Sequence, residues 1–188
     1  VQGRYFYITG KAVKLFDDLL VESVLIPVKN RTTACISSQV GCSLDCEFCA
    51  TSKLKRIRNL NADEIFDQAS TINLQSKHYY NRPISNIVFM GMGEPLLNYK
   101  NLILGIEKIT SKDGLGLSPK RITVSTSGIS KLIIKMADSQ VKFNLAVSLH
   151  SAIEETRNKI MPFSVKFPWE ELLNAIKYWN KKTGKIVT

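Results

Sequence analysis

Residues 42–49 read Cys-Ser-Leu-Asp-Cys-Glu-Phe-Cys and place three of the four cysteines of the chain within eight positions. Thiolates at this spacing on one short loop can converge on a single metal centre. A cubic iron–sulfur cluster normally takes four cysteine ligands, so three local cysteines indicate a [4Fe-4S] cluster with one iron left open for a non-protein ligand. Cys42, Cys46 and Cys49 are therefore candidate metal ligands.

A second interpretation uses the fourth cysteine. Cys35 lies seven residues before Cys42, so all four cysteines could form a structural zinc site or an electron-transfer cluster. Zinc motifs usually come as two closely spaced pairs, which this chain lacks. On spacing alone two hypotheses stay open: an open-iron cluster, or a zinc or iron–sulfur nucleic-acid-binding module with Cys35 as fourth ligand.

The composition is that of one globular domain. The chain has 188 residues, of which 44% are hydrophobic and 22% charged, as is ordinary for a folded protein with a real core. No apolar run approaches the ~20 residues of a membrane span, and the first residues are no signal peptide. Clustered cysteines are typical of metal ligands in a reducing compartment, so we expect a cytoplasmic protein without membrane association.

The formal net charge is +10, from 26 Lys and Arg against 16 Asp and Glu. An excess of this size favours phosphate-rich partners, although a solvated lysine-rich surface gives the same total. The placement adds information, because Lys53, Lys55, Arg56 and Arg58 directly follow the cysteine stretch. A polynucleotide substrate would need positive charge at that position.

Strand-like and helix-like segments alternate along most of the chain. Apolar runs predict strands at residues 33–37, 86–90, 121–126 and 143–149, and helical periodicity predicts helices from Asn61, from Asn98, over 129–137, over 154–159 and from Pro168 to Gly184. Such alternation indicates parallel βαβ units in an α/β fold, either a doubly wound sheet or an open β/α barrel. Chemistry then lies at the carboxyl ends of the strands.

The sequence predicts β structure at both ends of the chain. Residues 4–9 are strand-like, and residues 11–28 predict a hairpin that leads into the core, so residues 1–30 are interpreted as a β extension and residues 31–188 as the core domain. Residues 185–188 read as the opening of a further strand. The chain also begins with Val1, and we therefore expect a fragment of a longer protein.

The loop at residues 91–95, Gly-Met-Gly-Glu-Pro, is no dinucleotide fingerprint because the third glycine is missing. Its two glycines allow a close backbone approach to a ligand, and Glu94 can accept hydrogen bonds from an ammonium group. The alternative is a glycine-rich turn with a solvated acid. His78 is expected at the surface, whereas His150 closes a strand and is either core or site.

Together these segments are similar to the RlmN/Cfr family of radical S-adenosylmethionine (SAM) enzymes, which methylate adenine in RNA. The resemblance runs from about Glu22 to the last residue, in the order and spacing of the family, and Pro95 after the glutamate is typical of the branch that methylates adenine C2. The matching segments are residues 35–49, residues 89–96 (FMGMGEPL), residues 122–128 (ITVSTSG) and residues 146–151 (AVSLHS).

The resemblance implies a partial (β/α) barrel and a role for each matching residue. It implies that Cys42, Cys46 and Cys49 hold a [4Fe-4S] cluster. Glu22 matches a proton acceptor and Cys35 a reactive cysteine rather than a fourth ligand. The residues implied to contact SAM are Gly93, Glu94, Ser125, Ser148, Leu149 and His150.

In the mechanism that the resemblance implies, one SAM methylates a second cysteine near the C-terminus of the enzyme. A second SAM is cleaved reductively, the resulting carbon radical adds to C2 of an adenine in ribosomal or transfer RNA, and Cys35 helps to remove the C2 proton. An electron donor such as flavodoxin and a monomeric enzyme are expected. All four cysteines of this chain already have roles, so the methyl-carrying cysteine is missing and we expect no complete turnover.

Overall fold

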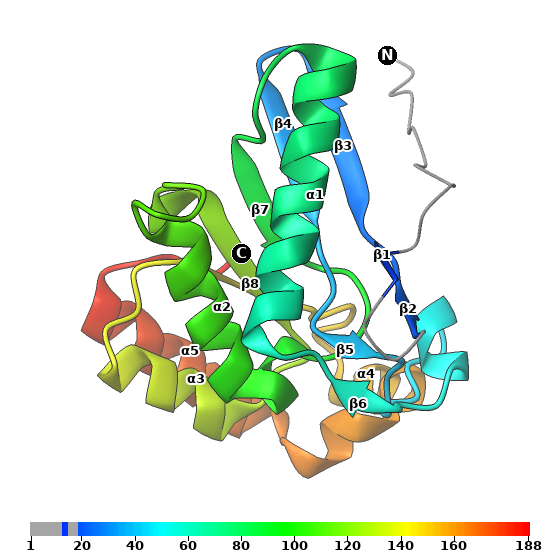
Figure 1. The fold of residues 1–188 in the computed structure, drawn as a ribbon. Helices are drawn as coiled ribbons and strands as arrows, with labels where there is room; N and C mark the ends of the chain where they lie inside the picture. Colours follow the sequence, from blue (N-terminus) through cyan, green and yellow to red (C-terminus); the bar gives the residue numbers. More distant parts are fainter. Residues whose placement is uncertain (1–12, 15–18) are drawn as a thin grey trace.

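The computed structural model describes residues 13–14 and 19–188, and its centre is a five-stranded sheet (Figure 1). The strands, in spatial order, are β3 (Val24–Val28), β4 (Arg31–Cys35), β7 (Asn86–Phe89), β8 (Ile122–Thr126) and β9 (Asn144–Val147). β3 pairs antiparallel with β4, and the other neighbours pair parallel. The parallel strands follow one another in sequence order, as in a partial β/α barrel. The α/β prediction is confirmed.

Helices connect the parallel strands. They are α1 (Ala62–Tyr80), α2 (Tyr99–Thr110) and α3 (Ser130–Asp138), with α4 (Glu154–Ile160) and α5 (Trp169–Thr183) after β9. α1 contacts α2, and α3 contacts α5, so these four helices form a layer along the sheet (Figure 1). The described part of the chain also has four 3₁₀ helices, one before α1 and three between later elements: η1 (Ala50–Lys53), η2 (Pro95–Asn98), η3 (Pro119–Arg121) and η4 (Pro162–Lys166). Among residues 13–14 and 19–188, no helix has the length and apolar character of a membrane span.

The core lies between the sheet and this helix layer. Its largest fully buried side chains come from strands and helices alike, and Trp179 of α5 and Phe89 of β7 are the bulkiest. On α2, Leu102, Ile106 and Ile109 are buried, whereas Ile103 is only half-buried. Burial of these apolar faces is the main free-energy gain that holds the helices on the sheet.

Helix α1 begins as the sequence predicts. The Asn61 side chain accepts from the Glu64 backbone N–H, and the Glu64 carboxylate accepts from the Asn61 N–H, each at 2.9 Å, which is a capping box. Helix α2 begins directly after Asn98, as the sequence predicts, and the Asn98 side chain makes no cap. Its amide instead donates to the carbonyls of Ser38 and Leu60 (2.8 and 2.7 Å), because these buried acceptors need a partner.

The expected hairpin at residues 11–28 is present in part. β1 (Val13–Lys14) pairs antiparallel with β2 (Leu20–Val21), while β3, separated from β2 by Glu22 and Ser23, pairs with β4 across the expected domain boundary at residue 30. The strand expected at residues 4–9 lies outside the described residues. The boundary itself stays a prediction.

Residues 185–188 lie beside β9. The Val147 N–H donates to the Thr188 carbonyl (2.9 Å), and the Thr188 N–H donates to the Leu145 carbonyl (3.1 Å). One residue bonded to two residues of the neighbouring strand in this way is the pattern of a parallel pair. The pairing agrees with the expected strand, although residues 185–188 have no assigned strand of their own.

Candidate cluster and cofactor site

The cysteine loop, residues 41–57, is held at its base by a two-stranded ribbon. β5 (Gln39–Val40) and β6 (Arg58–Asn59) pair antiparallel on either side of it. The Cys42 N–H donates to the Leu54 carbonyl (3.1 Å). Gly41 has a φ of +75°, and a Cβ there would lie 2.2 Å from the Lys55 carbonyl oxygen, so only glycine fits at this turn.

The three thiols of the loop are free and lie close to one another. Cys42 and Cys46 are buried, Cys49 is half-buried, and Leu44 and Met161 pack against them. Burial raises the pKa of the Cys42 and Cys46 thiols, and the neighbouring thiol charges raise that of Cys46 further, to about 11. Such thiols are protonated at neutral pH unless a metal or another cation compensates their charge.

These thiols fit an iron–sulfur cluster by their chemistry, since they are free, partly desolvated and on one loop. Within the described residues, however, no three histidine, cysteine or acidic side chains are gathered closely enough to hold one metal ion. A [4Fe-4S] cluster binds each thiolate at a different iron, so its cysteines need not gather around one ion. A hollow of about 340 Å³ beside Cys42, lined in part by Ser43, Lys55 and Arg56, adjoins the loop.

Glu94 joins the carboxyl ends of β7 and β8. Its side chain is only 3% exposed, and its carboxylate accepts from the backbone N–H groups of Leu96 (3.0 Å) and Ser127 (2.7 Å). Burial raises the pKa of this carboxyl, although these hydrogen bonds oppose the shift. The Glu94 charge also raises the pKa of Cys42 and Cys46, so the carboxylate lies within electrostatic reach of the thiols.

Gly93 brings the backbone of this loop against Gln39 of β5. It has a φ of +92°, and a Cβ there would lie 2.5 Å from the Gln39 Cβ. The Gln39 amide oxygen accepts from the Glu94 N–H (2.9 Å). The Gly-Glu-Pro loop is therefore fixed to the base of the cysteine loop.

The remaining expected SAM residues lie at the ends of β8 and β9. The hydroxyl oxygens of Ser125 and Ser148 are 3.5 Å apart, and Leu149 is half-buried. His150 is exposed, has a φ of +57°, and its ring centroid lies 3.9 Å from that of Phe48 in the cysteine loop. The chain thus returns from β9 onto the cysteine loop, which sequence spacing alone did not reveal.

Cys35 and Glu22 lie beside the end of β7, and not at the ends of β8 and β9. Cys35 pairs with Val24 of β3 and Val88 of β7, and burial raises the pKa of its thiol. The exposed Glu22 is fixed through its backbone: its carbonyl accepts from the Ser37 hydroxyl (2.6 Å), and its N–H points at the Met92 sulfur (3.4 Å). Cys35 is therefore a strand residue and not part of the cysteine loop.

Two buried residues of this region were not anticipated from the sequence. Arg157 of α4 donates to the Ser127 carbonyl, and the Ser127 N–H donates to Glu94. Arg157 sits in a charged helical segment that reads as a solvated surface, so its burial has no signature in the sequence. Ser127 lies in the matching segment 122–128, one residue after the predicted strand, but the resemblance gave it no role.

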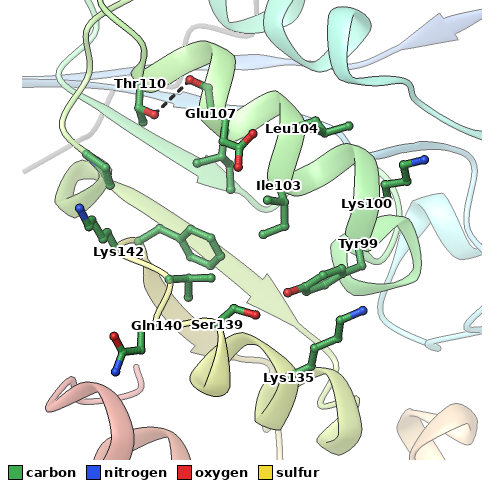
Figure 2. A pocket seen from close by; sticks show the side chains of 14 residues that line it. Tyr99, Lys100, Ile103, Leu104, Glu107, Thr110, Lys135, Ser139, Gln140 and Lys142 are labelled. Carbon is green, nitrogen blue, oxygen red and sulfur yellow. Dashed lines mark hydrogen bonds between the residues drawn. The ribbon is translucent and has the colours of Figure 1, made fainter.

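A larger hollow than the one beside Cys42 lies elsewhere. Figure 2 shows an open cleft of about 840 Å³ between α2 and the segment from α3 to β9. Tyr99, Ile103 and Glu107 of α2 line one wall, and Lys135 and Lys142 lie on the other side. No cysteine lines this cleft, so size alone does not identify the reactive centre.

Comparison with known proteins agrees with this geometry. The model of the radical SAM superfamily matches residues 36–188, which include the cysteine loop and the carboxyl ends of β7, β8 and β9. The chain belongs to the radical SAM superfamily. A crystal structure of a radical SAM methyltransferase from Sphaerobacter thermophilus superimposes with a TM-score of 0.89 at 36% identity, over 93% of this chain and 51% of that one.

Similar curated proteins carry a more specific name. A probable dual-specificity RNA methyltransferase RlmN from Flavobacterium psychrophilum is 67% identical over 177 residues, covering 94% of this chain and 51% of that protein. The dual-specificity RNA methyltransferase RlmN of Geotalea uraniireducens is 48% identical over 177 residues, covering 93% and 49%. The chain spans about half the length of the curated relatives it matches.

Proposed function

We propose that this radical SAM chain carries the cluster- and SAM-binding part of a methyltransferase that adds a methyl group to C2 of adenine in ribosomal and transfer RNA. The observation that carries the proposal is the convergence of the cysteine loop with the ends of β7, β8 and β9. Glu94 and His150 both reach the thiol loop from those strand ends. The names of the similar proteins supply the substrate class.

In this proposal Cys42, Cys46 and Cys49 hold a [4Fe-4S] cluster and leave one iron open for SAM. The bound cluster supplies one electron for the reductive cleavage of SAM. The chain supplies the surroundings: Leu44 and Met161 pack against the thiols and exclude water from them. Exclusion of water strengthens every electrostatic interaction at the site.

The SAM site is proposed at the ends of the parallel strands. Gly93 supplies a backbone without a side chain, and Ser125 and Ser148 supply adjacent hydroxyl groups that can donate or accept. Glu94, Leu149 and His150 complete the set. Because Glu94 already accepts two backbone hydrogen bonds, we propose that it binds the SAM ammonium group through its remaining acceptor capacity.

We further propose that Glu22 and Cys35 handle protons at the target base. Both are held beside the end of β7, Cys35 by strand pairing and Glu22 by backbone contacts. Burial keeps the Cys35 thiol protonated at neutral pH, so a base must remove its proton before it can accept another from adenine C2. The exposed Glu22 carboxylate is the proposed acceptor.

The electron donor is proposed to be a small carrier such as flavodoxin, and the protein is proposed to act as a monomer. A net charge of +10 favours association with an acidic carrier. We expect flavodoxin-dependent reduction of the cluster to slow as salt increases, because screening weakens attraction between exposed charges.

Anaerobic reconstitution with iron and sulfide tests the proposal. We expect about four irons per chain, and an electron paramagnetic resonance spectrum of the reduced protein that shifts when SAM is added. Cys46→Ser should lose the iron, and the matched variant Cys35→Ser should keep it. Bound zinc, loss of metal in Cys35→Ser, or a spectrum unaffected by SAM would refute the proposal.

A further inference from the structure

Arg157 is a buried cation beside the cysteine loop. Its side chain is 3% exposed, its terminal nitrogen donates to the Ser127 carbonyl, and its buried Nε has no hydrogen-bond partner among the described residues. Within that part of the chain no carboxylate lies within ion-pair distance of it. An unpaired buried charge is destabilising, so a nearby anionic group that completes the site would offset its cost.

The helix that carries Arg157 packs directly on the cysteine loop. The Glu47 N–H donates to the carbonyl of Ile160 at the end of α4 (3.0 Å), and Met161 packs against Cys42 and Cys46. The Met161 N–H also donates to the Arg157 carbonyl (2.8 Å), so the residue that packs on the two thiols lies one helical turn from Arg157. Arg157 is thus fixed from both sides, by its helix and by Ser127.

We propose that Arg157 is a positioning residue whose buried positive charge stabilises the reduced cluster and so raises its reduction potential. The inference rests on the proposed function, because it concerns the cluster held by Cys42, Cys46 and Cys49. Reduction adds one electron to a thiolate-ligated, anionic centre, and net charge near such a centre is a main determinant of its potential. A guanidinium is planar, carries a delocalised charge and is more weakly hydrated than an ammonium group, which suits it to a buried position.

Glu94 should change the reduction potential of the cluster in the opposite direction, because its charge is negative. Its buried carboxylate is negatively charged when ionised, and the Glu94 N–H donates to Gln39 at the base of the cysteine loop (2.9 Å). Ser127 connects the two charges, since its N–H donates to Glu94 and its carbonyl accepts from Arg157. Arg157 therefore offsets a negative charge that would otherwise make the cluster harder to reduce.

The test is a redox titration of the reconstituted protein, followed by electron paramagnetic resonance. In Arg157→Gln we expect the ratio of reduced to oxidised cluster at a fixed potential to fall about tenfold, which is about 59 mV for one electron. Arg157→Lys keeps the charge and should stay within about twofold of the wild type. Lys159→Gln, an exposed position on the same helix, is the matched control and should stay within the same range.

Each outcome decides the inference. An unchanged ratio in Arg157→Gln, or an equal fall in Arg157→Gln and Arg157→Lys, would overturn it, because the second result assigns the effect to the Ser127 hydrogen bond and not to charge. If Arg157→Gln does not fold or take up iron, Arg157→Lys is decisive: a tenfold fall overturns the inference and a ratio near the wild type supports it. A wild-type chain that holds no cluster refutes the proposed function instead.

Discussion

At the scale of single residues, Glu94 connects the chemistry of the site to the stability of the fold. One carboxylate satisfies two backbone N–H groups at two strand ends while lying within electrostatic reach of the thiols. A charge buried in this way is maintained only because its hydrogen bonds compensate for lost solvation. The stability of the fold is therefore sensitive to the protonation state of this residue.

The free energy of unfolding should decrease as the pH rises, because of Glu94. Its pKa is raised from the ordinary 4.5 by burial, so the folded protein binds this proton more tightly than the unfolded chain. The free energy of unfolding then decreases as the pH rises from about 4.5 through the folded-state pKa. Glu94→Gln cannot ionise, and urea denaturation at several pH values should show that this component is absent. Equal pH profiles in the two proteins would contradict the prediction.

Gly93→Ala should destabilise the fold more than Gly116→Ala. Both positions have a positive φ, which costs a side chain about 1–2 kcal/mol. At Gly93 the new Cβ would also lie 2.5 Å from the Gln39 Cβ, whereas Gly116 has no neighbouring atom within 4 Å. We expect losses of about 2–4 and about 1–2 kcal/mol respectively in chemical denaturation. Equal losses would show that Gln39 moves aside without penalty.

At the scale of elements, α1 shows how a local sequence can define a boundary. The capping box satisfies two backbone N–H groups that no helical hydrogen bond can reach. α1 then packs against β4, β3 and α2, so its first turn directly follows the ribbon that closes the cysteine loop. Fraying of this turn would loosen β6 and the loop base.

Asn61→Ala should lower the free energy of unfolding by about 1 kcal/mol, because the Glu64 N–H loses its acceptor. Asn61→Ser retains a capping oxygen and should recover most of the loss. Urea denaturation of both variants measures the difference. If alanine and serine behave alike, the cap contributes nothing and packing alone holds α1.

At the scale of the whole molecule, the charge of the chain bears on the proposed RNA substrate. Lys53, Lys55 and Arg56 are exposed in the second half of the cysteine loop, whereas Arg58 pairs with Glu64 at 2.7 Å. The first three can therefore meet phosphates beside the proposed reaction centre. Their position complements a target adenine that is unpaired or extruded.

Replacing Lys53, Lys55 and Arg56 together by glutamine should weaken binding of a single-stranded RNA oligonucleotide. The slope of log affinity against log salt should decrease in magnitude by about 2, since each phosphate contact to a single strand contributes about 0.7. Lys131, Lys177 and Lys181, which are exposed on α3 and α5, form the matched control triple. Equal slopes in the two triple variants would place the RNA surface elsewhere.

The sequence by itself determined the order and type of most elements. Asn61 and Glu64 predicted the start of α1, and the apolar run at residues 86–90 predicted β7, because capping and periodicity are local properties. The spacing of Cys42, Cys46 and Cys49 likewise indicated one metal centre. The start of α2 at Asn98 was predicted as well, whereas the hydrogen bonds of the Asn98 amide to distant carbonyls were not.

Only the tertiary structure decided which distant residues meet. Three contacts join segments that are 30 or more residues apart. His150 contacts Phe48, Ser127 donates to Glu94, and the buried Arg157 donates to Ser127. Local patterns carry no information on such contacts, because they depend on how the strand ends and α4 pack around the cysteine loop. A charged helix such as α4 reads as a surface until another part of the chain covers it.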